Sequence, residues 1–132
     1  MKTILIIDDE PAIVNALKKT ISAKLGYDVL TASDSQAGCE IAKNPDVKLI
    51  ISDLMMPGQV SGMDLINQLR AMRPDCPVIV LSGYPTNDRL KKTSDMGIEF
   101  LTKPFEIPFL TAAIERLLEA DSGSGSPPGA SK

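Results

Sequence analysis

The sequence predicts an α/β protein, a doubly wound parallel sheet of five strands covered by helices on both faces. Short β-branched runs alternate along the chain with longer stretches of helical period, which is the order expected of such a fold. Residues 4–7 and 78–81 are apolar at every position, as in strands that are buried on both faces of a parallel sheet. The chain has 132 residues, 43% of them hydrophobic, which is enough for one core but not for two domains.

Five short runs are the expected strands. They are residues 2–7, 28–31, 49–52, 78–82 and 99–102. Right-handed crossovers between parallel strands place the connecting helices on both faces of the sheet. Ligands of such sheets bind outside the carboxyl ends of the strands, so the residues that directly follow strands are the place to look for chemistry.

Apolar residues that recur at helical spacing predict the helices. In the first helix the stripe consists of Ile13, Leu17, Ile21 and Leu25. Gly26 is expected to end this helix, because glycine readily adopts the left-handed conformation found after a helix. The other four helices are expected near residues 35–43, 65–72, 86–96 and 109–118. The fourth is rich in charge and poor in apolar residues, so we expect it to be the least firmly docked.

Residues 1–120 are expected to form the folded domain, and residues 121–132, which lack a large apolar side chain, a flexible tail or linker. The apolar run at residues 4–7 is too short to span a bilayer and lacks the flanks of a signal peptide. Cys39 and Cys76 form no CxxC motif, and an unpaired, reduced state fits the cytoplasm, where we expect the protein to be.

The charge and the residue types present exclude several kinds of function. A net charge of −3 argues against direct binding of nucleic acid, since the chain has no excess of positive charge to neutralise phosphates. The chain has no histidine, which excludes a Ser-His-Asp triad, a histidine-ligated zinc site and phosphorylation on histidine. Metal chemistry would therefore use oxygen ligands, which favours a hard ion such as Mg²⁺.

Polar residues follow four of the five predicted strands. They are Asp8-Asp9-Glu10, Asp53, Ser82-Gly83 and Lys103-Pro104. Taken alone, each has an ordinary structural explanation as a helix start, a turn or a solvated surface lysine. Their coincidence at the carboxyl ends of one predicted sheet instead indicates a pocket with three close carboxylates, a hydroxyl and an ammonium group.

This set of groups is suited to phosphoryl transfer. Clustered carboxylates repel one another unless a cation neutralises them, and Mg²⁺ does so with carboxylates, waters and phosphate oxygens. The Asp53 carboxylate can attack phosphorus and form an acyl phosphate. Lys103 can offset charge on the phosphoryl oxygens, and the Ser82 hydroxyl can donate a hydrogen bond to one of them.

Over residues 1–120 the chain resembles the receiver-domain family of two-component response regulators. The motifs that carry the resemblance are DDE at 8–10, DLMMP at 53–57, Gly62, SG at 82–83 and KPF at 103–105. The resemblance implies a flavodoxin-like (βα)5 fold with strand order 2-1-3-4-5. It also implies a signalling phosphoacceptor, which assists its own phosphorylation and dephosphorylation but is not an enzyme in the wider sense.

The resemblance assigns roles to the residues of the pocket. Asp53 would be the phosphoacceptor, and Lys103 and Ser82 would assist phosphoryl transfer. Asp9 would bind Mg²⁺ directly and Asp8 mainly through water, and the Met55 backbone carbonyl would supply a further ligand. The peptide bond that follows Lys103 would be cis, a form that proline tolerates.

The resemblance also implies a switch and partners. Ser82 would be the switch hydroxyl and Phe100 the switch aromatic residue, acting on the face made by the fourth helix, the fifth strand and the fifth helix. A partner surface on this face would include Lys91, Lys92 and Phe109. The implied partners are a sensor histidine kinase or phosphotransfer protein, a downstream effector protein or domain, and a second copy in a phosphorylation-dependent dimer.

Two departures and three alternatives accompany this interpretation. Residues 57–62 make the loop about one residue longer than the usual spacing, and Ser82 replaces the more common threonine. An aspartate-nucleophile phosphatase would need a second aspartate where Met55 stands. A flavin-binding module would need a phosphate loop after the first strand, where the acidic residues 8–10 would repel phosphate. A receiver that only docks proteins, without phosphorylation, is the third alternative, and the complete set of site residues argues against it.

Overall fold

Five strands alternate with five α-helices along the described part of the chain. The computed structural model describes residues 2–54, 62–83 and 85–122, with side chains to residue 119. In chain order the elements are β1 Thr3–Ile7, α1 Pro11–Thr20, η1 Ile21–Leu25, β2 Asp28–Ala32, α2 Ser35–Ala42, β3 Val47–Asp53, α3 Gly62–Met72, β4 Val78–Ser82, α4 Asn87–Asp95, β5 Glu99–Thr102 and α5 Ile107–Ser122.

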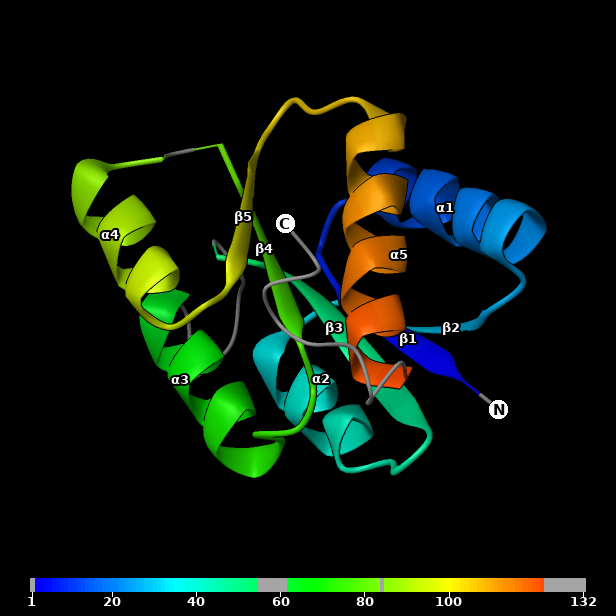
Figure 1. Ribbon diagram of the computed structural model, residues 1–132, viewed down its shortest axis with the longest axis horizontal. Coiled ribbons are helices and arrows are strands. Elements are labelled where there is room, and N and C mark those ends of the chain that lie inside the picture. Colours follow the sequence, from blue (N-terminus) through cyan, green and yellow to red (C-terminus); the bar gives the residue numbers. More distant parts are fainter. Residues whose placement is uncertain (1, 55–61, 84, 123–132) are drawn as a thin grey trace.

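The strands form one parallel sheet in the order β2-β1-β3-β4-β5 (Figure 1). The predicted fold class and strand order are therefore confirmed. The predicted bounds of β4 and β5 match those observed, whereas β3 is longer than expected and runs from Val47 to Asp53. Asp53, predicted to follow a strand, is thus the last residue of β3.

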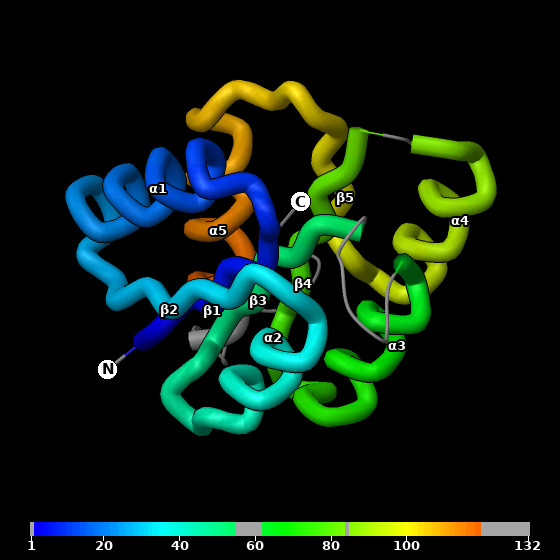
Figure 2. Tube along the Cα trace, turned by 180° about the vertical axis from the view of Figure 1, so that it is seen from behind, coloured from blue at the N-terminus to red at the C-terminus, as the bar shows by residue number. Residues whose placement is uncertain are grey.

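Alternate residues of the inner strands point to opposite faces of the sheet and enter two separate cores. Leu5 and Ile7 pack with α2 and α3 on one face, and Ile4 and Ile6 pack with α1 and α5 on the other. Figures 1 and 2 show the two pairs of helices on opposite sides of the sheet, with α4 beside α3 near the β5 edge. β1 is buried on both faces of the sheet, and all its residues except Thr3 are hydrophobic.

The first predicted helix continues into a different kind of turn. After α1, residues Ile21–Leu25 form the π-helical turn η1, in which the Gly26 N–H bonds the Ile21 carbonyl across 3.1 Å. An apolar spacing of four residues exceeds the 3.6 residues of an α-helical turn, so the stripe drifts around a regular helix. The wider turn brings Leu25 back against the core, and Gly26 ends the helix as predicted, with φ 73°.

The fourth helix is the least buried, as its composition predicted. Of residues Asn87–Asp95, all of which are described, only Thr93 is buried, and Leu90 is 39% exposed. The Thr86 side chain caps its first turn by accepting a hydrogen bond from the Arg89 N–H. The helix is thus held at its start by a local cap and adds little to the core.

The C-terminal helix α5 includes residues 121 and 122, the first two of the expected tail, and residues 123–132 lie outside the described part of the chain. None of the helices among the described residues combines the length and apolar character needed to cross a bilayer. Cys39 and Cys76, which both lie in the described part of the chain, are not joined by a disulfide.

Candidate functional site

The carboxyl ends of four strands meet at one edge of the sheet and bring the predicted residues together. Asp8 directly follows β1, and its N–H donates to the Ala32 carbonyl at the end of β2 across 3.0 Å. Asp53 ends β3 beside Leu81 of β4. Lys103 follows β5, and its N–H donates to the Ser82 carbonyl at the end of β4 across 2.8 Å. Backbone pairing alone therefore places these side chains around one pocket.

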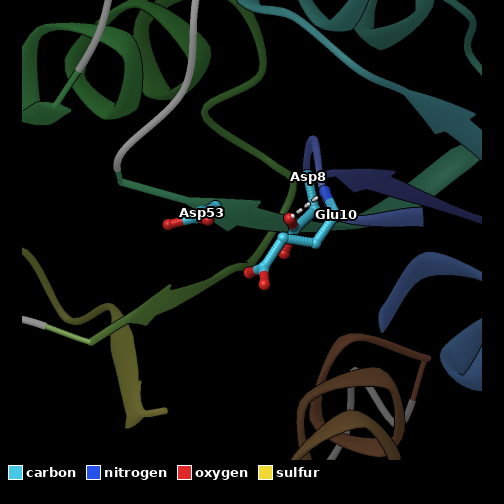
Figure 3. Close-up of side chains that lie close together, drawn as sticks. All are labelled: Asp8, Glu10 and Asp53. Carbon is cyan, nitrogen blue, oxygen red and sulfur yellow. Dashed lines mark hydrogen bonds between the residues drawn. The ribbon is translucent and has the colours of Figure 1, made fainter. Parts of the chain in front are cut away.

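Three carboxylates gather in this pocket, those of Asp8, Glu10 and Asp53. Each offers an oxygen atom, and these atoms lie within 4.8 Å of one another (Figure 3). Asp8 and Asp53 are buried, whereas Glu10 is exposed. The Glu10 N–H donates to Asp8 Oδ1 across 2.9 Å, and this bond fixes the turn that brings both side chains to the same side.

The Lys103 ammonium bonds all three carboxylates. Its Nζ lies 2.7 Å from Glu10 Oε1, 2.9 Å from Asp53 Oδ2 and 3.0 Å from Asp8 Oδ2. Burial by itself would lower the pKa of Lys103, but the hydrogen bonds to the three carboxylates outweigh it and raise the pKa. The ammonium is therefore charged at every physiological pH.

Asp8 is in the opposite situation. Burial raises the pKa of its carboxyl above the usual value, and the lowering effects of the Glu10 N–H and of Lys103 do not fully offset it. Three carboxylates and one ammonium leave the pocket with an excess of negative charge. A further cation bound here would relieve the repulsion between the carboxylates.

The donor atoms of the pocket fit a hard divalent cation. All three candidate ligands are carboxylate oxygens, which suit Mg²⁺ better than a softer metal. Asp9 is exposed and does not belong to this group, so its expected direct contact with Mg²⁺ stays a prediction. Met55 and the expected longer loop at residues 57–61 lie outside the described residues.

Ser82 lies at the end of its strand as expected, and Phe100 lies within β5. Ser82 is fully buried at the end of β4, and Phe100 is half-buried on β5 against the core on the α2–α3 face. The bond between Lys103 and Pro104 is cis, which confirms that expectation.

The sequence predicts Glu10 only as part of an acidic triplet, without a role of its own. Its position two residues after Asp8 was the available signal, because a tight turn can bring such neighbours to one side.

Comparison with known proteins decides the family. The family model of the response regulator receiver domain matches residues 4–115, which include all the strand-end residues described above. The chain is a response regulator receiver domain. It therefore belongs to a family of signalling domains. Its Asp8, Asp53, Ser82 and Lys103 lie at or directly after the carboxyl ends of β1, β3, β4 and β5.

Regulatory proteins and solved receiver domains are similar to this one. The DNA-binding transcriptional regulator NtrC of Azospirillum brasilense is 35% identical over 129 residues, which are 97% of this chain and 26% of that protein. The alkaline phosphatase synthesis transcriptional regulatory protein PhoP of Bacillus subtilis is 30% identical over 118 residues, or 89% of this chain and 48% of the relative. This receiver domain thus spans only a quarter to a half of the length of these two relatives.

Among solved structures, a CheY-like receiver domain protein from Methanospirillum hungatei has a TM-score of 0.84 at 26% identity, covering 94% of this chain and 98% of that one. The beryllofluoride-activated NtrC4 receiver domain dimer has a TM-score of 0.81 at 30% identity, covering 92% of this chain and 99% of that one. The whole receiver domain is therefore shared with both.

Proposed function

We propose that this receiver domain accepts a phosphoryl group on Asp53 from a phosphohistidine of a partner protein, with Mg²⁺ bound beside it. The observation that carries the proposal is the contact between Asp53 Oδ2 and Lys103 Nζ at 2.9 Å, inside a group of three carboxylates. A buried carboxylate that is held beside a permanent cation, at the carboxyl ends of parallel strands, is a positioned nucleophile.

The transfer step follows from the groups present. An Asp53 carboxylate oxygen forms a bond to phosphorus, the bond from phosphorus to the donor imidazole nitrogen breaks, and the electron pair of that bond stays on the imidazole. Lys103, already within hydrogen-bond distance of Asp53, donates to a phosphoryl oxygen and offsets its charge. Ser82, at the buried end of β4, would donate a hydrogen bond to another phosphoryl oxygen.

Asp8 and Asp53 are the residues that would hold Mg²⁺, with Glu10 within reach of the same position. The cation supplies charge neutralisation for the phosphoryl oxygens and for the carboxylates. Asp8 contributes a buried carboxylate, and burial raises its pKa above the usual value.

A groove beside Lys103 supports docking of the phosphoryl donor at this end of the domain. The groove has a volume of about 390 Å³ and lies between α1 and the segment that joins β5 to α5. Its lining is mainly apolar, with Ile13, Leu17 and Phe105, and it includes Lys103. A sensor histidine kinase or phosphotransfer protein that buries an apolar side chain here would bring its phosphohistidine close to Asp53.

The face made by α4, β5 and α5 is the proposed output surface. Leu90 on α4 and Phe109 on α5 are exposed, at 39% and 65%, and α4 is weakly buried. Movement of Ser82 toward the phosphoryl group would vacate space into which Phe100 turns, and a weakly docked α4 responds to a small free-energy input. An effector protein or domain, or a second phosphorylated copy, would bind the changed face, as the dimeric state of the NtrC4 neighbour suggests for this class of domain.

Labelling with a small phosphodonor tests the proposal. The protein is incubated with acetyl phosphate and Mg²⁺, and the phosphoryl group is counted by intact mass. We expect one added phosphoryl group in the wild type and none in Asp53→Asn. Equal labelling of Asp53→Asn would show that another residue is the acceptor. Labelling of the wild type that persists in excess chelator would show that phosphorylation does not require Mg²⁺.

A further inference from the structure

Glu10 occupies a place in the structure that its own helix does not explain. It is the N-cap residue of α1, with φ −97° and ψ 104°, yet its side chain caps none of the N–H groups in the described first turn. The side chains that usually cap this position are the shorter ones of Ser, Thr, Asp and Asn, and a negative charge here is favoured by the helix dipole alone. The Glu10 carboxylate instead reaches away from the helix to Lys103, across 2.7 Å.

The three acceptors of Lys103 differ in how far they are withdrawn from water. The side chains of Asp8 and Asp53 are 0% and 7% exposed, whereas the side chain of Glu10 is 56% exposed. An ammonium group has three protons, so the three acceptors use all of its hydrogen-bonding capacity. Glu10 is thus the partner that draws Lys103 outward, and Asp8 and Asp53 are the partners that draw it inward.

A cation that binds Asp8 and Asp53 draws on the same two buried carboxylates as the ammonium. Both positive groups cannot make full use of those oxygens, because Asp8 Oδ1 already accepts the Glu10 N–H. Glu10, on the solvent side, is the acceptor that Lys103 can keep while the buried oxygens serve the cation.

We propose that Glu10 is a positioning residue for Lys103: its carboxylate is the solvent-side acceptor that the ammonium keeps when a divalent cation takes over the oxygens of Asp8 and Asp53. This inference rests on the proposed magnesium-dependent function and adds a residue to it. Without the Glu10 charge, Lys103 would keep only Asp8 and Asp53 of these three carboxylates and would compete more strongly with the cation. With it, Lys103 stays close enough to Asp53 to meet an incoming phosphoryl group.

The test is the Mg²⁺ affinity of four proteins: wild type, Glu10→Gln, Lys103→Met and the double variant, titrated by calorimetry. We expect Glu10→Gln to weaken Mg²⁺ binding by about two- to fivefold when Lys103 is present, the size expected of one exposed ion pair. The loss should be smaller when Lys103 is replaced, because the competitor is then gone. Glu106→Gln removes the same charge from an exposed site three residues beyond Lys103, and serves as the matched control for net charge.

The sign of the coupling between the two substitutions separates the explanations. If Glu10 were instead a ligand of the cation, removal of Lys103 would free it for that role, and Glu10→Gln would cost more affinity in the Lys103→Met background. That result, or an equal loss in both backgrounds, would overturn the positioning role. So would a loss in Glu106→Gln as large as that in Glu10→Gln.

A spectroscopic readout covers the case in which Lys103→Met does not fold. The ammonium signal of Lys103 in ¹⁵N–¹H spectra should persist when Mg²⁺ saturates the wild type. In Glu10→Gln, Mg²⁺ should make this signal disappear, because the ammonium protons then exchange rapidly with water. Persistence in both proteins would contradict the proposal. Acetyl phosphate labelling of the wild type is measured in parallel. If Asp53 took no phosphoryl group while the coupling held, the proposed function would fail and the role of Glu10 would stand.

Discussion

Lys103 and Asp8 lie 95 residues apart in the sequence, yet the Lys103 ammonium donates to Asp8 Oδ2 across 3.0 Å. This contact joins the segment after the first strand to the segment after the last one. It does not fully stabilise Asp8, because burial still raises the pKa of that carboxyl. The acidic group thus contains more negative charge than the one ammonium offsets.

Asp8→Asn is expected to stabilise the protein at pH 7 in the absence of Mg²⁺, by about 1 kcal/mol in the free energy of unfolding. The amide oxygen can still accept the Glu10 N–H, while the buried negative charge is gone. The pKa of Asp8 is raised in the folded state, so folding favours its protonated form. The stability that this preference gives is fully present below the ordinary pKa of 3.8 and is lost as pH rises through the folded value.

The gain in stability from Asp8→Asn should therefore shrink as pH falls toward 4, which urea denaturation at several pH values would measure. Asp28→Asn changes an exposed aspartate of β2 and should alter stability by less than about 0.5 kcal/mol. Destabilisation by Asp8→Asn at pH 7 would mean that the bonds of Asp8 outweigh its burial.

Ser82→Ala should separate signalling from phosphoryl transfer. The variant should still take a phosphoryl group on Asp53, because Asp53 and Lys103 remain in place. Binding of beryllofluoride should change the rate of hydrogen exchange across residues 85–110 of the wild type. This change in rate should be smaller in the variant. Thr102→Ala removes a hydroxyl from the exposed register partner of Ser82 on β5 and should respond like the wild type. Unchanged exchange in the wild type, with the mimic bound, would contradict a switch on this face.

Arg73→Lys is expected to destabilise the fold by about 2–3 kcal/mol, measured by urea denaturation. The Arg73 guanidinium follows α3 and donates to the backbone carbonyls of Ala42, Asn44 and Val47 at 2.8–2.9 Å. It thereby ties the end of α2 and the start of β3 to α3. A lysine ammonium cannot span three carbonyls in this planar arrangement, so at least one would lose its partner.

Arg116→Lys is the matched control for Arg73→Lys. Arg116 is half-exposed and pairs with the Glu99 carboxylate across 2.7 Å, a contact of the surface type. We expect a change below about 1 kcal/mol for it. Equal effects of the two substitutions would show that the carbonyl contacts of Arg73 contribute no more than a surface ion pair.

Gly38→Ala tests the close approach of α2 to β1. A Cβ atom at Gly38 would lie 2.6 Å from Ile7 Cδ1, and Ile7 is fully buried. The overpacking should outweigh the better helix propensity of alanine and cost about 1 kcal/mol net in the free energy of unfolding. Ile7→Val removes the Cδ1 atom, so Gly38→Ala should cost less in that background. An additive double variant would show that the two side chains do not interact.

The sequence determined the strands, the α-helices and most residues of the candidate site. Apolar runs such as residues 4–7 and 78–81 predicted buried strands because burial on both faces of a sheet tolerates few polar side chains. Gly26 ended the first helix as predicted, since its φ of 73° is a local property of the residue type. Asp8, Asp53, Ser82 and Lys103 were found from their places after strands, because the carboxyl ends of parallel strands share one edge.

Tertiary structure decided which side chains of the acidic triplet face the pocket. Glu10 joins Asp8 and Asp53 and Asp9 does not, because the turn after β1 is set by the Glu10 N–H bond to Asp8 and by Lys103. The π-helical turn at Ile21–Leu25 and the three carbonyls held by Arg73 were likewise not predicted. A repeating pattern reports which residues are buried, whereas the direction of a side chain in a single turn depends on contacts with segments far away in the sequence.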